Sequence, residues 1–327
     1  MPRAPRRPPQ LRGRVFRGST AVSRGLLTRN DLRSSAWRSL FRDVYADAQV
    51  TVTHDVRCAA VGRWLIPSGA AIAGRAAAGL YGCASPTAGD PIDGLIPMAT
   101  RVGPTTGIHI HHGVIDPGDT VDRAGVRVTS PARTCWDIAR WLEVVEAVVV
   151  IDSMLAKRLT TVTALREYAL DRAGRRGWRS LLRAVDLADA GAESPQESRT
   201  RVRLVLAGLP RPETQWVVAE QGRFVARLDL AWPQFKVAVE YDGLWHDDPE
   251  QLHRDRRRLN RLLGRRLDSA ARDSRAPPGR LRRIPVRGPG GPTGALPLHP
   301  MTMIALQVGS SGLPRPGGHY FIDGARS

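Results

Sequence analysis

The sequence predicts an α/β protein with more than one domain, and three observations support this prediction. Its 327 residues, 42% of them hydrophobic and 24% charged, are enough for roughly two folded cores. Strand-like segments such as 108–114, in which apolar and polar residues alternate, occur between segments with helical spacing. Serine followed by proline, at Ser130-Pro131 and Ser194-Pro195, is typical of the first residues of a helix.

The charge of the chain points to a polyanionic partner. Forty-nine lysines and arginines against 31 aspartates and glutamates give a net charge of +18, and Lys157 and Lys236 are the only lysines. A GC-rich genome favours arginine, and so does a phosphate-binding surface, because guanidinium groups pair bidentately with phosphate. The two explanations are compatible, so nucleic acid is the leading class of partner.

Cysteine usage and the N-terminus indicate a reduced compartment. Cys58, Cys83 and Cys135 are far apart, which supports neither a disulfide framework nor a thiolate zinc site. Residues 1–14 carry charge but lack the apolar core of a signal peptide, and no run of about eighteen apolar residues is free of charge. We therefore expect a cytoplasmic protein with no membrane partner.

The N-terminal region is expected to bind DNA. Residues 1–17 are a basic, proline-rich arm that we expect to be disordered. Residues 18–103 begin with two short helical patterns and a strand at 44–46, an order that suits a winged helix-turn-helix region.

The second of these helical patterns would face DNA. It is built on Trp37, Leu40 and Phe41, and as a helix it would carry Arg38 and Arg42 toward the groove. The same apolar residues equally fit a core stripe with no role in binding.

Residues 104–190 continue with strands at 108–114 and 126–128, then helices from Ser130, over 146–158 and on to about 189. The first strand contains three histidines, which are possible metal ligands, but no cysteine or further ligand follows at the spacing usual for a zinc site. We interpret them as polar strand residues. They are His109, His111 and His112.

Two stretches of this half resemble a known family. The segments GLLTRNDL…WRSLFRDVYA and GVRVTSPARTCWDIAR resemble the AbiEi-type antitoxin and transcriptional-regulator proteins of actinobacteria, over roughly residues 20–185. The resemblance implies a winged-helix DNA reader at the N-terminus and a cognate toxin protein as a partner.

Residues 191–264 contain a cluster of carboxylates. A helix is expected from Ser194, followed by strands near 216–220, 224–231 and 236–242.

The last two of these strands are joined by a tight connection at Gln234-Phe235. If the hairpin is symmetric, Asp229 lies directly opposite Glu240, and Asp242 lies on the same face. Opposed carboxylates destabilise a sheet, so a compensating divalent cation is expected, and Mg²⁺ or Mn²⁺ takes such oxygen ligands.

Two of these acids also have structural explanations. Glu197, in the first turn of the preceding helix, either supplies a further acid or completes a Ser-x-x-Glu capping box with Ser194. Asp242 precedes Gly243, and this dipeptide is typical of a turn.

Further candidates follow the hairpin. His246 is a general base, a phosphate contact or an inert turn residue. A helix expected over 249–263 carries arginines that form either a solvated face or, beside a carboxylate site, a surface that follows phosphates. The DNA-contact candidates on it are Arg254, Arg257, Arg258 and Arg261.

These residues carry a second resemblance. The run ESPQESRTR…ARLDLAWPQFKVAVEYDGLWHDDPEQLHRDRRRLNRLLG is similar to a domain-of-unknown-function family in the PD-(D/E)XK nuclease superfamily, near the very-short-patch-repair (Vsr) endonucleases. The resemblance implies a restriction-endonuclease-like α/β core and metal-dependent hydrolysis of phosphodiester bonds. By motif, Asp229 and Glu240 are the first and second metal acids. Glu197 is the helix acid, and His246 lies in the histidine-bearing turn. Asp242 stands where the superfamily has lysine, so that lysine's electrophilic support is missing.

The composition changes at residue 265. Residues 265–327 contain 19 glycines and prolines in 63 positions, a level typical of low-complexity chain, and no further core strand is evident. Two explanations stay open. One is a frameshift near residue 264, since the neighbouring reading frame can encode a strand-like segment. The other is a genuine disordered basic tail that helps to hold DNA.

Two functions therefore follow from the sequence. The first is a DNA-binding protein with a Vsr-like, Mg²⁺-dependent endonuclease domain. The second is a non-catalytic antitoxin or transcriptional regulator whose nuclease fold is vestigial. Metal binding by Asp229 and Glu240 discriminates between them. RNA is a weaker candidate substrate, because no aromatic stacking platform is evident.

Overall fold

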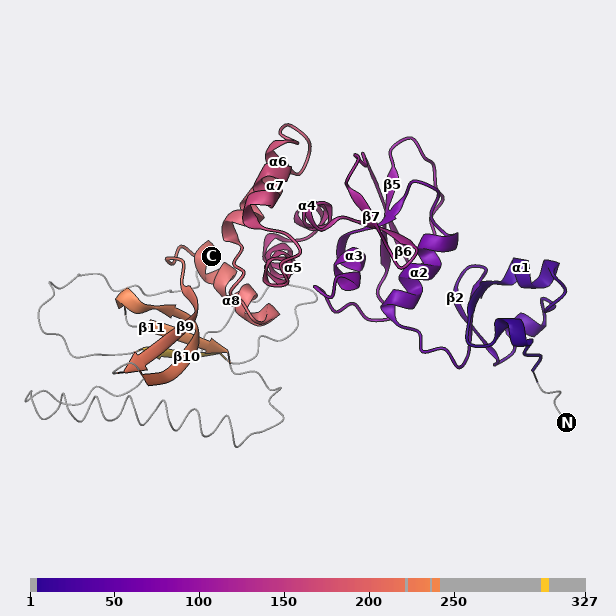
Figure 1. The fold of residues 1–327 in the computed structure, drawn as a ribbon, viewed down its shortest axis with the longest axis horizontal. Helices are drawn as coiled ribbons and strands as arrows, with labels where there is room; N and C mark the ends of the chain where they lie inside the picture. The colour runs from indigo at the N-terminus through magenta and orange to yellow at the C-terminus, as the bar shows by residue number, and fades with distance from the viewer. Residues whose placement is uncertain (1–4, 221–222, 236, 242–300, 306–327) are drawn as a thin grey trace, which may run out of the picture. The chain divides into compact units, whose positions relative to one another are not determined.

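The computed structural model describes residues 5–220, 223–235, 237–241 and 301–305. Helices and strands are mixed along the chain, with three sheets in the described residues, so the predicted α/β class is confirmed (Figure 1). The chain divides into two compact units, Met1–Ala190 and Gly191–Ser327. Within the described residues, no helix is both long and apolar enough to cross a lipid bilayer.

The first unit begins with a small antiparallel sheet of strand order β1-β3-β2. Phe16 and Trp37 meet edge to face, with ring centroids 5.1 Å apart, and Ala21 and Leu27 complete the same buried cluster. The elements are η1 (Pro9–Leu11), β1 (Val15–Arg17), α1 (Gly18–Ser23), η2 (Asp31–Arg33), β2 (Trp37–Phe41) and β3 (Val44–Asp47).

The structure corrects two predictions here and confirms one. The arm predicted to be disordered contains η1 and β1, and Asp47 accepts a 2.7 Å hydrogen bond from the Gly13 amide within it. The segment predicted as the second helix is strand β2. Residues four apart lie on one side of a helix and also of a strand, so the spacing of Trp37 and Phe41 fits both. The strand predicted at 44–46 is confirmed as β3.

A five-stranded mixed sheet of order β6-β5-β4-β8-β7 follows in the same unit. The pairs β5–β6 and β4–β8 are parallel, and the other two pairs are antiparallel. The strands predicted at 108–114 and 126–128 are confirmed as β6 and β8. The elements are α2 (His54–Trp64), β4 (Ala71–Ile72), α3 (Gly74–Leu80), β5 (Ile92–Pro97), β6 (Ile108–Gly113), β7 (Thr120–Arg123) and β8 (Val126–Thr129).

Four helices complete this unit, and their starts follow from local capping. Ser130 Oγ accepts a hydrogen bond from the Arg133 amide at 3.4 Å, with proline in the first turn, as the Ser-Pro pair predicts. The helix predicted over 146–158 is α5, two residues earlier at each end. The helices are α4 (Pro131–Trp141), α5 (Val144–Ala156), α6 (Val162–Leu170) and α7 (Trp178–Leu187).

In the described residues of the second unit, one helix packs against an antiparallel sheet of order β12-β11-β10-β9. Leu204 of the helix contacts a cluster on the sheet formed by Leu230, Trp232 and Val239. The elements are α8 (Pro195–Leu206), β9 (Glu213–Glu220), β10 (Arg223–Trp232), η3 (Pro233–Phe235), β11 (Val237–Tyr241) and β12 (Met301–Ala305).

One prediction about this unit is wrong. No further core strand was expected after the hairpin. Strand β12 nevertheless lies inside the segment predicted to be low-complexity tail, and it pairs with β11 along all five of its residues. The sequence MTMIA of β12 has the apolar character that a strand needs, although glycine and proline dominate the composition around it. The remaining tail, 265–300 and 306–327, lies outside the described residues.

Candidate functional site

A row of polar residues crosses the sheet of the second unit. Strands β10 and β11 pair Leu230 with Val239, so the next pair in this antiparallel register is Asp229 opposite Glu240, as the hairpin symmetry predicts. On the other side of β10, the neighbouring pairs place Gln215 of β9 beside Asp229. Three successive strands therefore contribute an amide and two carboxyl residues to one row.

Helix α8 brings a further acid to this row. Ser194 is the N-cap residue of this helix, and its Oγ accepts a 3.2 Å hydrogen bond from the Glu197 amide. Glu197 Oε2 in turn accepts hydrogen bonds from Gln215 Nε2 at 2.8 Å and from the Glu193 amide at 3.0 Å. The Ser194 half of the predicted capping box is thus present, but the Glu197 carboxylate accepts from the Glu193 amide, one residue before the Ser194 amide that a capping box uses. The same carboxylate also contacts the polar row through Gln215.

The buried face of α8 is unusually polar. Three of its four buried side chains are Glu197, Ser198 and Arg201, and the fourth is Val202. Arg201 is fully buried. Burying charged groups costs free energy unless they are paired and hydrogen-bonded, so this face is not built for apolar packing alone. Such a polar interior is expected where a helix supplies ionisable groups to a site.

The environment of Glu197 in the row disfavours its charged form. Burial raises the pKa of Glu197, and the negative charge of Asp229 raises it further. Hydrogen bonds from Glu193, Ser194 and Gln215 act in the opposite direction. Glu197 and Asp229 therefore lie close enough to repel one another when both are ionised. A divalent cation would remove that repulsion.

The donor chemistry fits Mg²⁺ or Mn²⁺, since carboxylate oxygens are the ligands these ions prefer. Among the described side chains, no three histidine, cysteine, aspartate or glutamate groups are gathered at metal-binding distance. The fit rests on Glu197 and Asp229 together with the strand position of Glu240, whose side chain is not among those described.

The remaining predicted site residues fall into two groups. Arg38 is exposed on β2, and Arg42 is exposed in the turn that follows, so neither is carried by a helix. Six others lie outside the described residues. They are Asp242, His246, Arg254, Arg257, Arg258 and Arg261.

Gln215 was not predicted from the sequence. The expected strand began near residue 216, whereas β9 begins at Glu213 and includes Gln215. Its place beside Asp229 depends on the pairing of two strands, which no local pattern encodes. Only a predicted strand that began at residue 213 instead of 216 would have included Gln215.

The histidines of β6 lie beside an aspartate. His109 and His111 share a face, as alternation predicts, and both approach Asp93 of β5, with N–O distances of 3.7 and 3.0 Å. The His111 ring also stacks on Trp141 at 3.6 Å between centroids. The position of His111 is thus explained by contacts within the sheet and α4.

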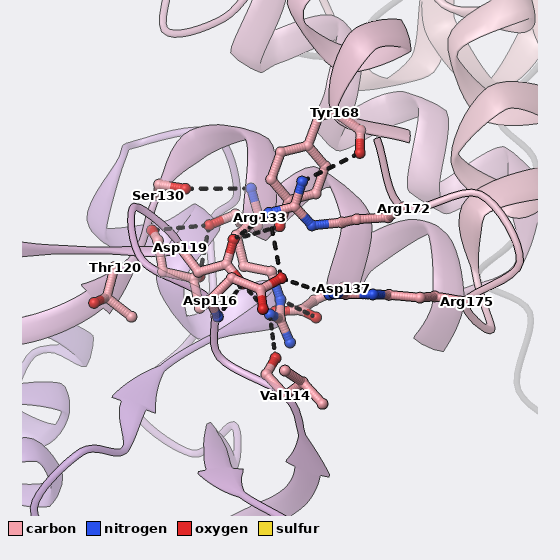
Figure 2. A network of polar contacts seen from close by, with 12 residues as sticks. Val114, Asp116, Asp119, Thr120, Ser130, Arg133, Asp137, Tyr168, Arg172 and Arg175 are labelled. Carbon is pink, nitrogen blue, oxygen red and sulfur yellow. Dashed lines mark hydrogen bonds and ion pairs between the residues drawn. The ribbon is translucent and has the colours of Figure 1, made fainter. Parts of the chain in front are cut away.

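A second polar network ties the β6–β7 loop of the first unit to its helices (Figure 2). Asp119, 1% exposed, accepts from Tyr168 at 2.6 Å and pairs with both Arg133 and Arg172. Arg133 also contacts Asp137 and the Val114 carbonyl. Because nearly every group in it is satisfied internally, this network is structural.

The comparisons with known proteins point to a mycobacterial family. No protein-family model matches the chain. Two relatives are each 32% identical to it over 192 residues, which is 57% of this chain and 70% of each relative. They are uncharacterized protein MT2308 of Mycobacterium tuberculosis strain CDC 1551 / Oshkosh and uncharacterized protein Rv2248 of strain ATCC 25618 / H37Rv. At this identity and coverage, the chain belongs to the same family as these two mycobacterial proteins.

Proposed function

We propose that this protein binds DNA and hydrolyses its phosphodiester bonds with Mg²⁺ or Mn²⁺ held at the polar row. The observation that carries the proposal is the meeting of Glu197, Gln215 and Asp229, with Glu240 in register beside Asp229. The sequence similarity of residues 193–264 to PD-(D/E)XK nucleases supports it, because that family places acids at these positions.

Each residue of the row has a chemical role in this proposal. Asp229 and Glu240 would hold the metal, which would supply a lowered pKa of a bound water and stabilisation of charge on the phosphate. Glu197 adds negative charge and accepts a hydrogen bond from Gln215, which fixes the orientation of its carboxylate. His246 and the arginines of 249–263 are proposed to orient the substrate backbone.

The N-terminal sheet is proposed as a second DNA contact. Residues 5–50 contain ten arginines and three aspartates, and two of those aspartates pair with Arg17 and Arg7. Arg38 and Arg42 are exposed and project from a strand and its turn. This surface would attract a polyanion at long range. The proposed cytoplasmic location agrees with such a partner.

A non-catalytic role is the second candidate, and one observation favours it. Asp242 stands where the nuclease superfamily has lysine. Without that cation, the chain would lack part of the usual stabilisation of the transition state. In this case the protein would act as an AbiEi-like regulator or antitoxin that binds DNA and a toxin protein.

Cleavage of a plasmid and of mismatched duplex by the full chain distinguishes the two. We expect nicking with Mn²⁺, none with EDTA, and loss of at least 100-fold in rate for Asp229→Asn. The matched control is Asp171→Asn, at an exposed aspartate just after α6. DNA binding without any metal-dependent cleavage would reject the nuclease and favour the regulator.

A further inference from the structure

An arginine shares the face of β10 that carries Asp229. Side chains alternate between the two faces of a strand, so Arg227 and Asp229 point to the same side, with their Cα atoms roughly 6.5 Å apart. The register shift in β10 lies between Phe224 and Ala226, before both residues. Leu228 between them is 2% exposed, whereas the side chain of Arg227 is 49% exposed. Strand β10 therefore brings a solvent-accessible cation next to the polar row.

The side chain of Arg227 reaches the start of α8. Arg227 Nη2 donates a 2.8 Å hydrogen bond to Glu193 Oε2, and the Glu193 amide donates at 3.0 Å to Glu197 Oε2. The same oxygen of Glu197 accepts from Gln215 at 2.8 Å. A continuous series of contacts thus joins the guanidinium group to the acid and the amide of the row.

The ion pair between Arg227 and Glu193 is of a kind that another anion can replace. The two side chains are 49% and 53% exposed. An ion pair between exposed groups contributes little to stability, because water and salt screen it. The hydrogen bond engages Nη2, which is one nitrogen of a guanidinium that can present a fork of donors to two oxygens. A phosphate group offers such a pair of oxygens, so it can compete with Glu193 for this arginine.

The polar row needs a cation of this kind if a phosphate group is to approach it. The row consists of acids and one amide, which are Glu197, Asp229, Glu240 and Gln215. Acids repel a phosphate unless positive charge lies beside them. Hydrolysis of a phosphodiester also places further negative charge on the phosphate oxygens, which fixed cationic donors stabilise. An arginine binds two of these oxygens at once, with a defined orientation.

We propose that Arg227 binds a DNA phosphate at the polar row, and that Glu193 occupies its guanidinium group until the phosphate replaces it. This inference rests on the proposed function, because it takes DNA as the ligand and the polar row as the site. Arg227 attracts and orients the DNA backbone, whereas Glu193 weakens that attraction in the free protein. These opposite roles differ from those in a purely structural ion pair, where loss of either residue has the same consequence.

Binding of a short DNA duplex by the full chain in EDTA measures the role of Arg227 without metal or cleavage. We expect Arg227→Gln to weaken binding about tenfold and to lower the slope of log K against log salt by about one. Arg227→Lys should regain part of the affinity, because it keeps the charge but not the fork. The matched control is Arg203→Gln, at an exposed arginine in the last turn of α8, and it should weaken binding less than threefold. Equal affinity in the wild type and in Arg227→Gln would overturn the proposal.

Glu193 provides the sharper test. Glu193→Gln should tighten DNA binding at least threefold, and this gain should disappear in the double variant with Arg227→Gln, because Glu193 acts through Arg227. Glu213→Gln removes the same charge at an exposed position of β9 and should have an equal, smaller effect with and without Arg227. Weaker binding by Glu193→Gln, or a gain that persists without Arg227, would contradict the exchange of Glu193 for phosphate.

Cleavage with Mn²⁺ separates this inference from the proposed function. We expect the single-turnover rate at saturating DNA to fall at least tenfold in Arg227→Gln and to be intermediate in Arg227→Lys. A wild type that binds and cleaves DNA, with Arg227→Gln equal to it in both assays, rejects the inference and leaves the proposed function intact. A wild type that neither binds nor cleaves DNA rejects both.

Discussion

Gln215 Nε2 donates a 2.8 Å hydrogen bond to Glu197 Oε2, joining the edge strand β9 to the first turn of α8. Gln215 has a φ of 52°, in the left-handed region that non-glycine residues rarely adopt. Such a conformation costs on the order of 1 kcal/mol or more and persists where surrounding contacts impose it. The hydrogen bond to the buried Glu197 carboxylate is one such contact. The backbone conformation of β9 thus places the Gln215 amide beside Glu197.

The first prediction concerns this amide. Gln215→Leu removes the donor that orients Glu197, and we expect the affinity for Mn²⁺ to fall by about 10- to 100-fold, the usual effect of removing a group that orients a metal ligand. Calorimetric titration of the metal-free protein measures this. The matched control is Gln234→Leu, at an exposed glutamine in η3. Equal loss in both variants would mean that the effect is not specific to the row.

Local signals in the sequence were sufficient for the helix starts and the hairpin. Ser130 and Ser194 cap their helices as predicted, because a cap depends on residues three positions apart. The symmetric register of the hairpin, from Leu230–Val239 to Trp232–Val237, also followed from the sequence, since a tight connection fixes the register of the strands that it joins.

The failures have a common physical cause. Strand β2 was predicted as a helix because the spacing of its apolar residues fits both periods, and only pairing with β3 decides between them. Strand β12 and the place of Gln215 likewise depend on a partner strand distant in sequence. Contacts of this kind are fixed by tertiary structure and leave no pattern within a short window.

The second prediction concerns the buried network of the first unit. Arg133, with 5% of its side chain exposed, pairs with Asp119 and Asp137. Arg133→Ala leaves buried carboxylates without this partner, so we expect the free energy of unfolding to fall by about 3–5 kcal/mol. Urea denaturation measures it. Arg166→Ala, which breaks the exposed pair with Asp186, should cost less than about 1 kcal/mol. Similar losses in both would contradict the structural role of the network.

The third prediction is a pH dependence. Burial raises the pKa of Asp137 to about 6, above the value of about 3.9 in an unfolded chain. Between these values the folded state holds a proton that the unfolded state releases. Asp137 therefore contributes stability that is complete below about pH 4 and is lost as the pH rises through 6.

Asp137→Asn cannot ionise and tests this prediction. We expect the free energy of unfolding of the variant to increase relative to that of the wild type as the pH rises from 4 to 6.5, because only the wild type loses stability over this range. Urea denaturation across this range measures the difference. Asp186→Asn, at a largely exposed carboxylate, is the matched control. A difference for Asp137→Asn that does not change with pH would show that the carboxylate is ionised throughout.

The last prediction separates stability from function at the polar row. Glu197 is buried beside the charge of Asp229, and burial is the larger cause of its raised pKa. Glu197→Gln removes the repelled charge while keeping an oxygen to accept from Gln215. We therefore expect the metal-free variant to be at least as stable as the wild type, because functional sites retain charges that weaken the fold.

Metal should reverse this order. At a Mn²⁺ concentration 100 times its dissociation constant, the wild type should gain about 2.7 kcal/mol, and Glu197→Gln should gain clearly less. Thermal unfolding with and without Mn²⁺ measures both quantities. Glu193→Gln, which alters an exposed acid four residues earlier, should keep the full gain. If Glu197→Gln destabilises the metal-free protein and retains the full metal response, Glu197 serves only to start the helix, and the metal is held without it.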